Sequence, residues 1–476
     1  MNRKRTKIVA TISDRRCEPE FIRELYEAGM DAIRINSAHL TIEGALKIIE
    51  NGRRISDKIP FLLDTKGPEI RTTDSDAPIV MTKGQNITMM GDPHAKSSKD
   101  CIFVNYTGFT DDVPEGSSIL IDDGEVELRV EGKDGNILNC VSVNDGTIGS
   151  RKSVNVPKVN FCLPSVSEKD KEFLAFAAVQ DIDFIAHSFV RNRQDVEDVQ
   201  AILDSHGSEA KIIAKIENQE GVDNIDDILE VVYGVMVARG DLAIEIPYEK
   251  IPGIQKMIIE KCIRLRKPVI VATQVLHSMI NNPRPTRAEV SDIANAIYSQ
   301  TDALMLSGET ANGKYPAEAV RTMTRVALEA ESNKERYIEM PAGEMTGKVS
   351  AYLAKVAVKT SIRIGAKALI ADTARGRTIR NMAAFRGYNL VLTQCYSKRT
   401  MRELAISYGV YTTYLEKKNS VDEFLKRALA GMTSSYDLAD DDIVVVLAGN
   451  FSGGKGFSFI EVGTVEYLRG RVEEKA

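Results

Sequence analysis

Residues 211–241 read KIIAKIENQEGVDNIDDILEVVYGVMVARGD and contain one complete strand–helix–strand unit. The runs KIIAKIE (211–217) and GVMVARG (234–240) have strand length and are rich in Ile, Val and Met. Their near-continuous apolar character is typical of parallel strands that are buried on both faces. The polar segment between the runs is long enough for a crossover helix. The stretch therefore predicts an α/β architecture with a parallel sheet.

Six further runs of the same kind occur along the chain, which makes eight in all. They are KIVATIS (7–13), DAIRINS (31–37), PFLLDT (60–65), DFIAHSF (183–189), PVIVATQ (268–274) and DALMLSG (302–308). Most of the intervals between the runs have helical patterns, and capping-box sequences begin at Ser167 and Thr286. Eight such βα units predict a (β/α)8 barrel. Two open sheets of four units each remain the alternative.

The interval between the third and fourth runs has a different pattern. From about residue 73 to residue 153 it contains repeated turn signals, among them Asp123-Gly124 and Asn144-Asp145-Gly146, separated by short alternating runs. This pattern predicts a small β-barrel domain inserted after the third strand. We expect the barrel to comprise residues 1–72 and 154–335 and the insertion residues 73–153. An insertion there lies at the carboxyl end of the barrel strands, so it can act as a mobile lid.

A polar linker, ESNKERYIEMPAGEMTG, follows the barrel at residues 331–347. Strand and helix patterns then alternate to the end of the chain, starting with a helix over 349–363 and a strand in AKALIAD. Such alternation is typical of an open, doubly wound α/β sheet. We therefore expect a third domain over residues 348–476.

The composition excludes several classes of protein. The chain has 476 residues, with 62 basic and 68 acidic residues and a net charge of -6, which argues against a nucleic-acid-binding protein. It has no run of 18 apolar residues for a membrane span, and its first residues lack the apolar core of a signal peptide. Six scattered cysteines without a CxxC pair indicate reduced thiols. We therefore expect a cytoplasmic protein that contacts neither nucleic acid nor membrane.

Polar residues gather at the carboxyl ends of the eight runs, and the central group is Lys215, Glu217 and Asp241. Lys215 and Glu217 share a face because strand residues alternate, and Asp241 follows the next strand. Two carboxylates from neighbouring strands favour Mg²⁺ or Mn²⁺. The lysine can stabilise a transferring phosphoryl group or an enolate oxygen. The alternatives are a structural Lys215–Glu217 ion pair and a Schiff-base lysine.

Two neighbouring segments carry further candidate groups. In LLDTKGPEIRT (62–72), Asp64 and the Thr65 carbonyl offer oxygens to a cation, and Arg71 can reach a phosphate at the junction with the lid. In the turn Arg239-Gly240-Asp241, backbone amides can hold a carboxylate, and Gly240 permits a close approach.

These segments together resemble the pyruvate kinase family. The matching blocks are IIAKIENQEGV, LLDTKGPEIRT, MVARGDL, KPVIVATQ, SMINNPRPTRAEVSDIANAI and TDALMLSGETANGKYPAEAV, and they occur in the order of the family. The resemblance covers nearly the whole chain. It implies transfer of the phosphoryl group of phosphoenolpyruvate to ADP, giving pyruvate and ATP in glycolysis through an enolate. It also implies Mg²⁺, usually K⁺, and a homotetramer.

The resemblance assigns roles by position. Glu217 and Asp241 match the Mg²⁺ ligands, and Lys215 matches the residue that stabilises the transferring phosphoryl group and the enolate. Arg34 matches the residue that grips the substrate phosphate, while the Gly240 and Asp241 amides and Thr273 match the carboxylate site. Thr273 also lies near the path of proton delivery. The K⁺ ligands match Asn36, Asp64 and Thr65, and the nucleotide-side positions match Asn36, His39, Arg71 and Lys152.

The chain departs from the family pattern in two strand-end motifs. Ala38 replaces the serine that usually gives the K⁺ site a hydroxyl, and Ser37 stands one position earlier, where strand alternation is expected to point it away. Ser13-Asp14 replaces the usual Gly-Pro of the first strand, which alters the wall expected near the adenine.

The C-terminal domain contains a further candidate site. Its loop resembles the phosphate loop of the family's sugar-phosphate effector site, since it follows a strand and opens a helix. The loop residues are Thr373, Arg375, Gly376, Arg377 and Thr378. An ordinary capped helix is the alternative.

Two other functions remain open at this stage. A metal-dependent aldolase also places a lysine and carboxylates at the end of a barrel. A catalytically weak homologue that senses a phosphorylated metabolite fits the altered positions, Ala38 and Ser13-Asp14.

Overall fold

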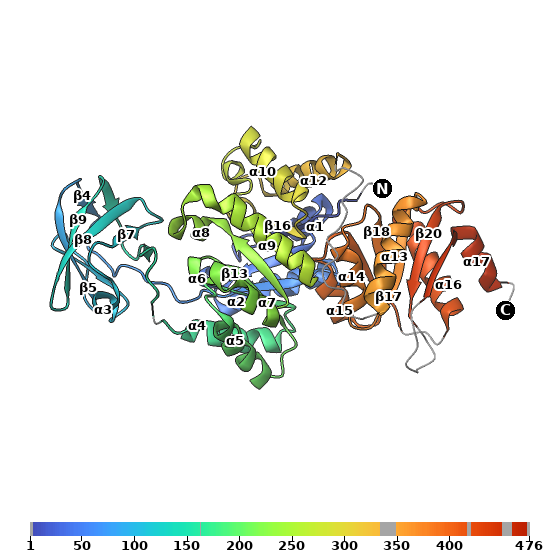
Figure 1. Cartoon of the computed structure of the whole chain (residues 1–476), viewed down its shortest axis with the longest axis horizontal. Coiled ribbons are helices and arrows are strands. Elements are labelled where there is room, and N and C mark those ends of the chain that lie inside the picture. Colours follow the sequence, from blue (N-terminus) through green and yellow to red (C-terminus); the bar gives the residue numbers. More distant parts are fainter. Residues whose placement is uncertain (1–2, 162, 334–348, 417–419, 450–458, 474–476) are drawn as a thin grey trace.

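The computed structural model describes residues 3–161, 163–333, 349–416, 420–449 and 459–473. Figure 1 shows the inserted domain, the barrel and the C-terminal domain in a row, with the barrel in the middle. Among the described residues, no helix has both the length and the apolar character that crossing a bilayer requires.

Eight parallel strands close into a barrel in the order β1-β16-β15-β14-β13-β12-β3-β2. Their bounds are β1 Lys7–Thr11, β2 Ala32–Asn36, β3 Phe61–Asp64, β12 Phe184–His187, β13 Lys211–Ile216, β14 Gly234–Ala238, β15 Val269–Ala272 and β16 Ala303–Leu306. Each strand lies within one of the eight predicted runs, and nearly every strand residue is buried. The barrel is therefore confirmed, and the alternative of two open sheets is wrong.

Helices cover the outside of the barrel. They are α1 Pro19–Ala28, α2 Ile42–Ile55, α4 Glu168–Val179, α5 Arg193–Ser205, α6 Gln219–Asp223, α7 Ile225–Val231, α8 Arg239–Glu245, α9 Ile251–Leu265, α10 Arg287–Tyr298, α11 Gly308–Ala311 and α12 Pro316–Ser332. The predicted capping boxes form in α4, between Ser167 and Asp170, and in α10, between Thr286 and Glu289. Both therefore start where the sequence pattern placed them.

The insertion between β3 and β12 is an all-β domain with one short helix, α3 Phe109–Asp112. It has a six-stranded sheet, ordered β11-β7-β8-β9-β5-β6, and a two-stranded sheet, β10-β4. The strands are β4 Ile79–Met81, β5 Asn86–Gly91, β6 Cys101–Val104, β7 Ser118–Ile121, β8 Val126–Asp134, β9 Ile137–Ser142, β10 Gly146–Ile148 and β11 Val154–Asn155. The domain has its own apolar core, separate from that of the barrel.

The C-terminal domain is a five-stranded sheet in the order β19-β18-β17-β20-β21, parallel except for the β20–β21 pair. Its elements are α13 Val349–Arg363, β17 Ala368–Thr373, α14 Arg377–Ala384, β18 Leu390–Cys395, α15 Lys398–Leu404, β19 Val410–Tyr414, α16 Val421–Tyr436, β20 Ile443–Ala448, β21 Phe459–Thr464 and α17 Val465–Glu473. One apolar cluster joins the sheet to α13, α14 and α15, and another joins it to α16 and α17. Helices on both faces confirm the doubly wound arrangement.

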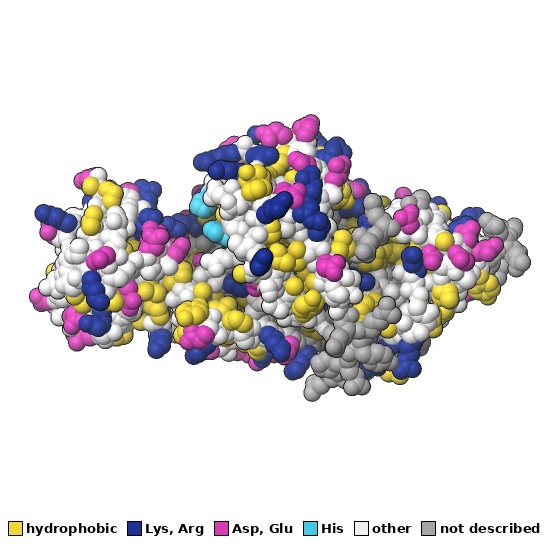
Figure 2. All heavy atoms as spheres, turned by 90° about the horizontal axis from the view of Figure 1, so that it is seen from above, with side chains coloured by type: hydrophobic (Ala, Val, Ile, Leu, Met, Phe, Trp, Pro, Cys, Tyr) yellow, Lys and Arg dark blue, Asp and Glu magenta, His cyan; other side chains and the backbone are white. Residues whose placement is uncertain are grey.

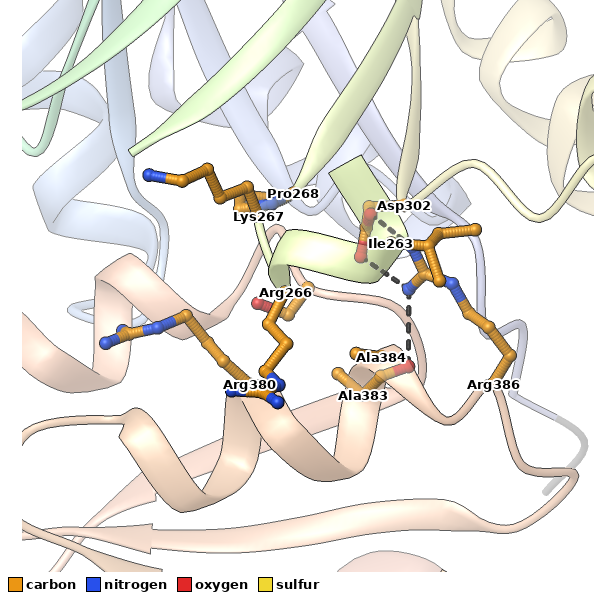
Figure 3. Close-up of a pocket in the computed structure, with 10 residues that line it drawn as sticks. Ile263, Arg266, Lys267, Pro268, Asp302, Arg380, Ala383, Ala384 and Arg386 are labelled. Atoms are coloured by element: carbon orange, nitrogen blue, oxygen red, sulfur yellow. Dashed lines mark hydrogen bonds and ion pairs between the residues drawn. The ribbon is translucent and has the colours of Figure 1, made fainter. Parts of the chain in front are cut away.

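The C-terminal domain packs against the amino ends of the barrel strands. Arg386 donates to both carboxylate oxygens of Asp302, just before β16, at 2.7 and 2.6 Å, and to the Ala383 carbonyl (Figure 3). Ile406 joins the apolar cluster inside the barrel, and Arg402 pairs with Asp183, just before β12, at 2.6 Å. These contacts leave the carboxyl ends of the strands free for a site on the side of the lid.

Candidate active site at the carboxyl end of the barrel

Lys215 of β13 lies at the centre of a buried polar cluster. Its ammonium is 3.0 Å from Asp64 Oδ1, 3.0 Å from Glu217 Oε1 and 2.7 Å from Ser188 Oγ. Burial alone would lower the pKa of Lys215, but Asp64 and Glu217 outweigh burial and raise the pKa above its ordinary value. A Schiff-base lysine must lose its proton before it attacks a carbonyl, so this ammonium is suited to stabilising negative charge instead.

Glu217 and Asp241 place two carboxyl groups beside that ammonium. The two groups lie close enough to influence each other's pKa, and the amide of Phe189 donates to Glu217 Oε2 at 2.6 Å. Burial raises the pKa of Glu217 to about 7, and burial also raises the pKa of Asp241. A cation bound between two buried neighbouring carboxylates stabilises their negative charges.

The donor set fits Mg²⁺ or Mn²⁺. Both side chains offer oxygen only, and Mg²⁺ usually binds one or two protein carboxylates together with water and substrate oxygens. Glu217 and Asp241 can provide a two-carboxylate site that substrate oxygens and water complete. Across the described ranges, no group of three or more His, Cys, Asp and Glu side chains is arranged to hold a metal ion.

Arg34 and Lys215 are held apart by one carboxylate. Asp64 Oδ2 accepts from Arg34 Nε at 2.6 Å, while Asp64 Oδ1 faces Lys215. Burial would raise the pKa of Asp64, but the two cations more than offset burial, and the pKa lies below its ordinary value. Thr11 Oγ accepts a further bond from Arg34 at 3.1 Å. Arg34 and Lys215 thus offer two fixed cations, one on each oxygen of Asp64, that can bind a phosphate.

The end of β2 differs from the expectation for Ser37. The strand ends at Asn36, and Ser37–His39 form a short 3-10 helix, so strand alternation no longer applies. Ser37 is fully buried, and its hydroxyl donates to the Asp64 carbonyl at 2.7 Å. Asn36 Oδ1 accepts from the Ala38 amide at 3.2 Å, and Ala38 contributes no hydroxyl. His39 is exposed at the end of this turn.

Thr65 and Ser188 connect this region to Lys215. The Ser188 hydroxyl donates to the Thr65 carbonyl at 2.7 Å, and the Ser188 amide donates to Thr65 Oγ at 3.0 Å. Ser188 Oγ also accepts from the Lys215 ammonium. The turn after β12 therefore joins the candidate K⁺ oxygens to the central lysine.

Thr273 and Gly240 lie together on the opposite side of the site. Thr273 Oγ accepts from the Gly240 amide at 2.7 Å and donates to the Ala272 carbonyl at 2.7 Å. A cavity of about 400 Å³ adjoins them, and its lining includes Asp241, Thr273 and Asp123 of the lid. Figure 2 shows histidine side chains beside the hollow between the lid and the barrel.

Arg71 and Lys152 lie on the two segments that connect the inserted domain to the barrel, which are paired by a bond from the Thr72 amide to the Lys152 carbonyl at 2.8 Å. Arg71 pairs with Glu69 at 2.7 Å, and Lys152 pairs with Asp122 of the lid. The structure thus brings these two predicted residues together where the inserted domain joins the barrel. The floor of the candidate site at the end of the barrel is formed by six other predicted residues: Lys215, Glu217, Asp241, Arg34, Asp64 and Thr273.

The predicted effector loop lies between β17 and α14. Gly376 has a φ of 75°, in the left-handed region that favours glycine, and its amide donates to Thr373 Oγ at 2.8 Å. Arg375 and Arg377 are exposed, and Thr378 is half-buried in the first turn of α14.

The sequence pattern assigned no specific role to several residues of the site. Asp123 reaches the cavity from the lid, and Ser188 and Ser37 bind the groups around Lys215 and Asp64. Only Ser188 had a signal in the sequence, because it ends an apolar run as the other site residues do.

Comparisons with known proteins agree with this geometry. Residues 3–320 match the family model "Pyruvate kinase, barrel domain", and residues 352–462 match "Pyruvate kinase, alpha/beta domain". The pyruvate kinase of Borreliella burgdorferi is 47% identical over 476 residues, covering 98% of this chain and 99% of that protein. The pyruvate kinase of Clostridium acetobutylicum is 40% identical, covering 96% of this chain and 99% of that protein.

A solved structure is also similar to this chain in its three-dimensional fold. The crystal structure of a pyruvate kinase from Cryptosporidium parvum superposes with a TM-score of 0.92 at 34% identity, covering 98% of this chain and 96% of that chain. The likeness includes the barrel, the inserted domain and the C-terminal domain in one chain. With both family models, near-complete relatives and this structure in agreement, the chain belongs to the pyruvate kinase family.

Proposed function

We propose that the cluster around Lys215 carries out the pyruvate kinase reaction, in which phosphoenolpyruvate and ADP give pyruvate and ATP. The observation that carries the proposal is the Lys215 ammonium, which lies 3.0 Å from Glu217 Oε1 and 3.0 Å from Asp64 Oδ1. Phosphoryl transfer depends mainly on positioning and on electrostatic stabilisation, and this cluster supplies both.

Each residue has a role that follows from its charge and place. Arg34 binds the phosphate of phosphoenolpyruvate, and Lys215 stabilises the negative charge of the transferring phosphoryl group and of the enolate oxygen left behind. The Gly240 and Asp241 amides bind the substrate carboxylate, and the Thr273 hydroxyl lies on the path of the proton that converts the enolate to pyruvate. Glu217 and Asp241 would hold Mg²⁺ or Mn²⁺, which when bound supplies positive charge to the phosphoryl oxygens.

The nucleotide approaches from the side of the lid. Arg71 and Lys152 place two cations at the junction of the inserted domain with the barrel, while Asn36 ends β2 and His39 follows it. We assign these four residues to ADP. Closure of the lid excludes water, which otherwise competes with ADP as phosphoryl acceptor.

Members of this family generally use K⁺ as well, and Asn36, Asp64 and Thr65 are our candidate ligands. The Asp64 carboxylate is already bound by Arg34 and Lys215, and Ala38 provides no hydroxyl. We therefore expect K⁺ to stimulate the enzyme only at high concentration. Ala38→Ser restores a hydroxyl at this position and should lower the half-saturating K⁺ concentration about tenfold, if one ligand contributes about 1.4 kcal/mol.

Steady-state kinetics in a K⁺ titration, with tetramethylammonium maintaining ionic strength, measures this effect. Ser37→Ala is the matched control because the Ser37 hydroxyl is already bonded to the Asp64 carbonyl. An unchanged K⁺ requirement in Ala38→Ser would exclude position 38 from the site.

Turnover of phosphoenolpyruvate with ADP and Mg²⁺ tests the function itself. We expect ATP and pyruvate in equal amounts and no product without the divalent ion. An aldolase would instead cleave a carbon–carbon bond, and a sensor would bind phosphoenolpyruvate without turnover. Either result would overturn the assignment.

We also propose a role for each domain, an effector site and an oligomeric state. We assign residues 1–72 with 154–335 to the catalytic barrel, 73–153 to the lid and 348–476 to a regulatory and interface domain; within these bounds, β11 (Val154–Asn155) pairs with the sheet of the lid. Thr373, Arg375, Gly376, Arg377 and Thr378 are the candidate site for a sugar-phosphate effector. A cytoplasmic homotetramer is the form we propose for the active enzyme.

A further inference from the structure

We infer that Arg239 and Asp292 are positioning residues that lock the backbone of Thr273 in the conformation required at the carboxylate site. The inference rests on the proposed role of Thr273. Neither side chain is assigned a contact with the substrate; both act on the loop after β15.

Thr273 lies in a strained backbone conformation. Thr273 has a φ of 67° and Gln274 a φ of 53°, so two consecutive non-glycine residues occupy the left-handed region. Such residues are uncommon there, and for a β-branched residue the conformation is an outlier. Each such residue costs about 1–3 kcal/mol and persists only where surrounding contacts enforce it. The contacts that hold Thr273 therefore determine where its hydroxyl lies.

Arg239 provides the contact that binds the Thr273 backbone. One terminal nitrogen donates to the Thr273 carbonyl at 2.9 Å, and the other donates to both carboxylate oxygens of Asp292 at 2.8 Å. Arg239 begins α8, and its side chain is only 12% exposed. Its charge is matched by Asp292, so the guanidinium acts on the loop rather than on a substrate anion.

A second contact joins the same two loops. Gly240 follows Arg239, and its amide donates to Thr273 Oγ at 2.7 Å. Arg239 thus binds the Thr273 carbonyl while the next residue binds the Thr273 hydroxyl. The amide and the hydroxyl proposed to hold the substrate carboxylate are therefore fixed relative to each other by the Asp292–Arg239 pair.

The geometry requires an arginine at this position. A guanidinium is planar and can direct two nitrogens to two partners at once, whereas an ammonium is a compact point charge. Within the described residues, Arg239 Nε is buried and has no hydrogen-bond partner, so the side chain acts through its two terminal nitrogens. We expect lysine to keep the charge but lose the link between Asp292 and the Thr273 carbonyl.

The test compares Arg239→Lys, Arg239→Gln and Asp292→Asn in the full-length enzyme. We expect kcat to fall about a hundredfold in Arg239→Gln, since small misplacements of reacting groups cost this much, with little rescue in Arg239→Lys. We expect exchange of pyruvate methyl protons with D2O, followed by NMR with ATP and Mg²⁺, to fall in parallel. The KM for ADP and the affinity for Mn²⁺ should stay unchanged.

Two comparisons separate this role from a structural one. Arg193→Gln is the matched control, because Arg193 also bonds two acidic partners, Glu197 and Glu230, on the exposed surface of α5 and α7. The double variant Arg239→Gln with Asp292→Asn should lose little more than Arg239→Gln alone. Variants with normal kcat and normal methyl exchange would overturn the inference, even if they unfold more easily. Absence of turnover in the unmodified enzyme would instead refute the proposed function.

Discussion

Lys215→Met is expected to lower kcat about a thousandfold, because removal of one fixed charge at a transition state has effects of this order. The ammonium lies 3.0 Å from both Asp64 Oδ1 and Glu217 Oε1, and the charge of Asp241 also helps to raise its pKa. The KM for phosphoenolpyruvate should change far less than kcat, because Arg34 and the carboxylate site remain to bind the substrate. Steady-state kinetics at saturating Mg²⁺ measures both parameters.

Lys171→Met is the control for this substitution. Lys171 lies on α4, where it forms an exposed ion pair with Glu168, so its loss should leave both parameters unchanged. A Lys215→Met enzyme in which KM rises while kcat stays unchanged would show that the lysine binds the ground state as strongly as the transition state. That result would contradict its assigned role.

Asp302→Ala is expected to lower the free energy of unfolding by about 3–5 kcal/mol, the range for breaking a buried ion pair by removing one partner. Asp302 accepts two bonds from Arg386 and further bonds from the amides of Val269 and Tyr408. The Arg386 side chain is only 3% exposed, so its charge would stay buried without a partner. Urea unfolding followed by circular dichroism measures the change.

Glu24→Ala is the control, because Glu24 forms an ion pair with Arg321 in which both side chains are nearly half exposed. Such a pair is worth less than about 1 kcal/mol. Since Asp302 and Arg386 join the barrel to the C-terminal domain (Figure 3), Asp302→Ala should also separate the unfolding of the two domains. A loss no greater than that of Glu24→Ala would show that this pair does not secure the junction.

Much of the barrel and its site can be predicted from the sequence, because local rules determine them. A strand repeats every two residues, so Lys215 and Glu217 had to share a face once the run around them was assigned to a strand. The carboxyl ends of parallel strands lie at one edge of the sheet, so Asp64 and Asp241 were expected at the same end of the barrel as Lys215. The chain-wide resemblance added the roles that these residue types alone left open.

The parts that escaped prediction depend on contacts between distant segments. Ser37 turns toward Asp64 because the strand gives way to a 3-10 helix, and no periodic pattern marks that change. Asp123 reaches the cavity only through the orientation of the lid domain. Arg239 meets Asp292 across the space between α8 and α10, which the sequence spacing does not reveal.

Binding of Mn²⁺, followed by electron paramagnetic resonance of the free ion, tests the central claim most directly. We expect Glu217→Gln and Asp241→Asn each to weaken binding at least about tenfold, since each removes one of two charged oxygen ligands. Glu220→Gln, in the first turn of the next helix, should bind like the unmodified enzyme. Equal affinity in all four proteins would show that the ion is held elsewhere and that the site is wrongly assigned.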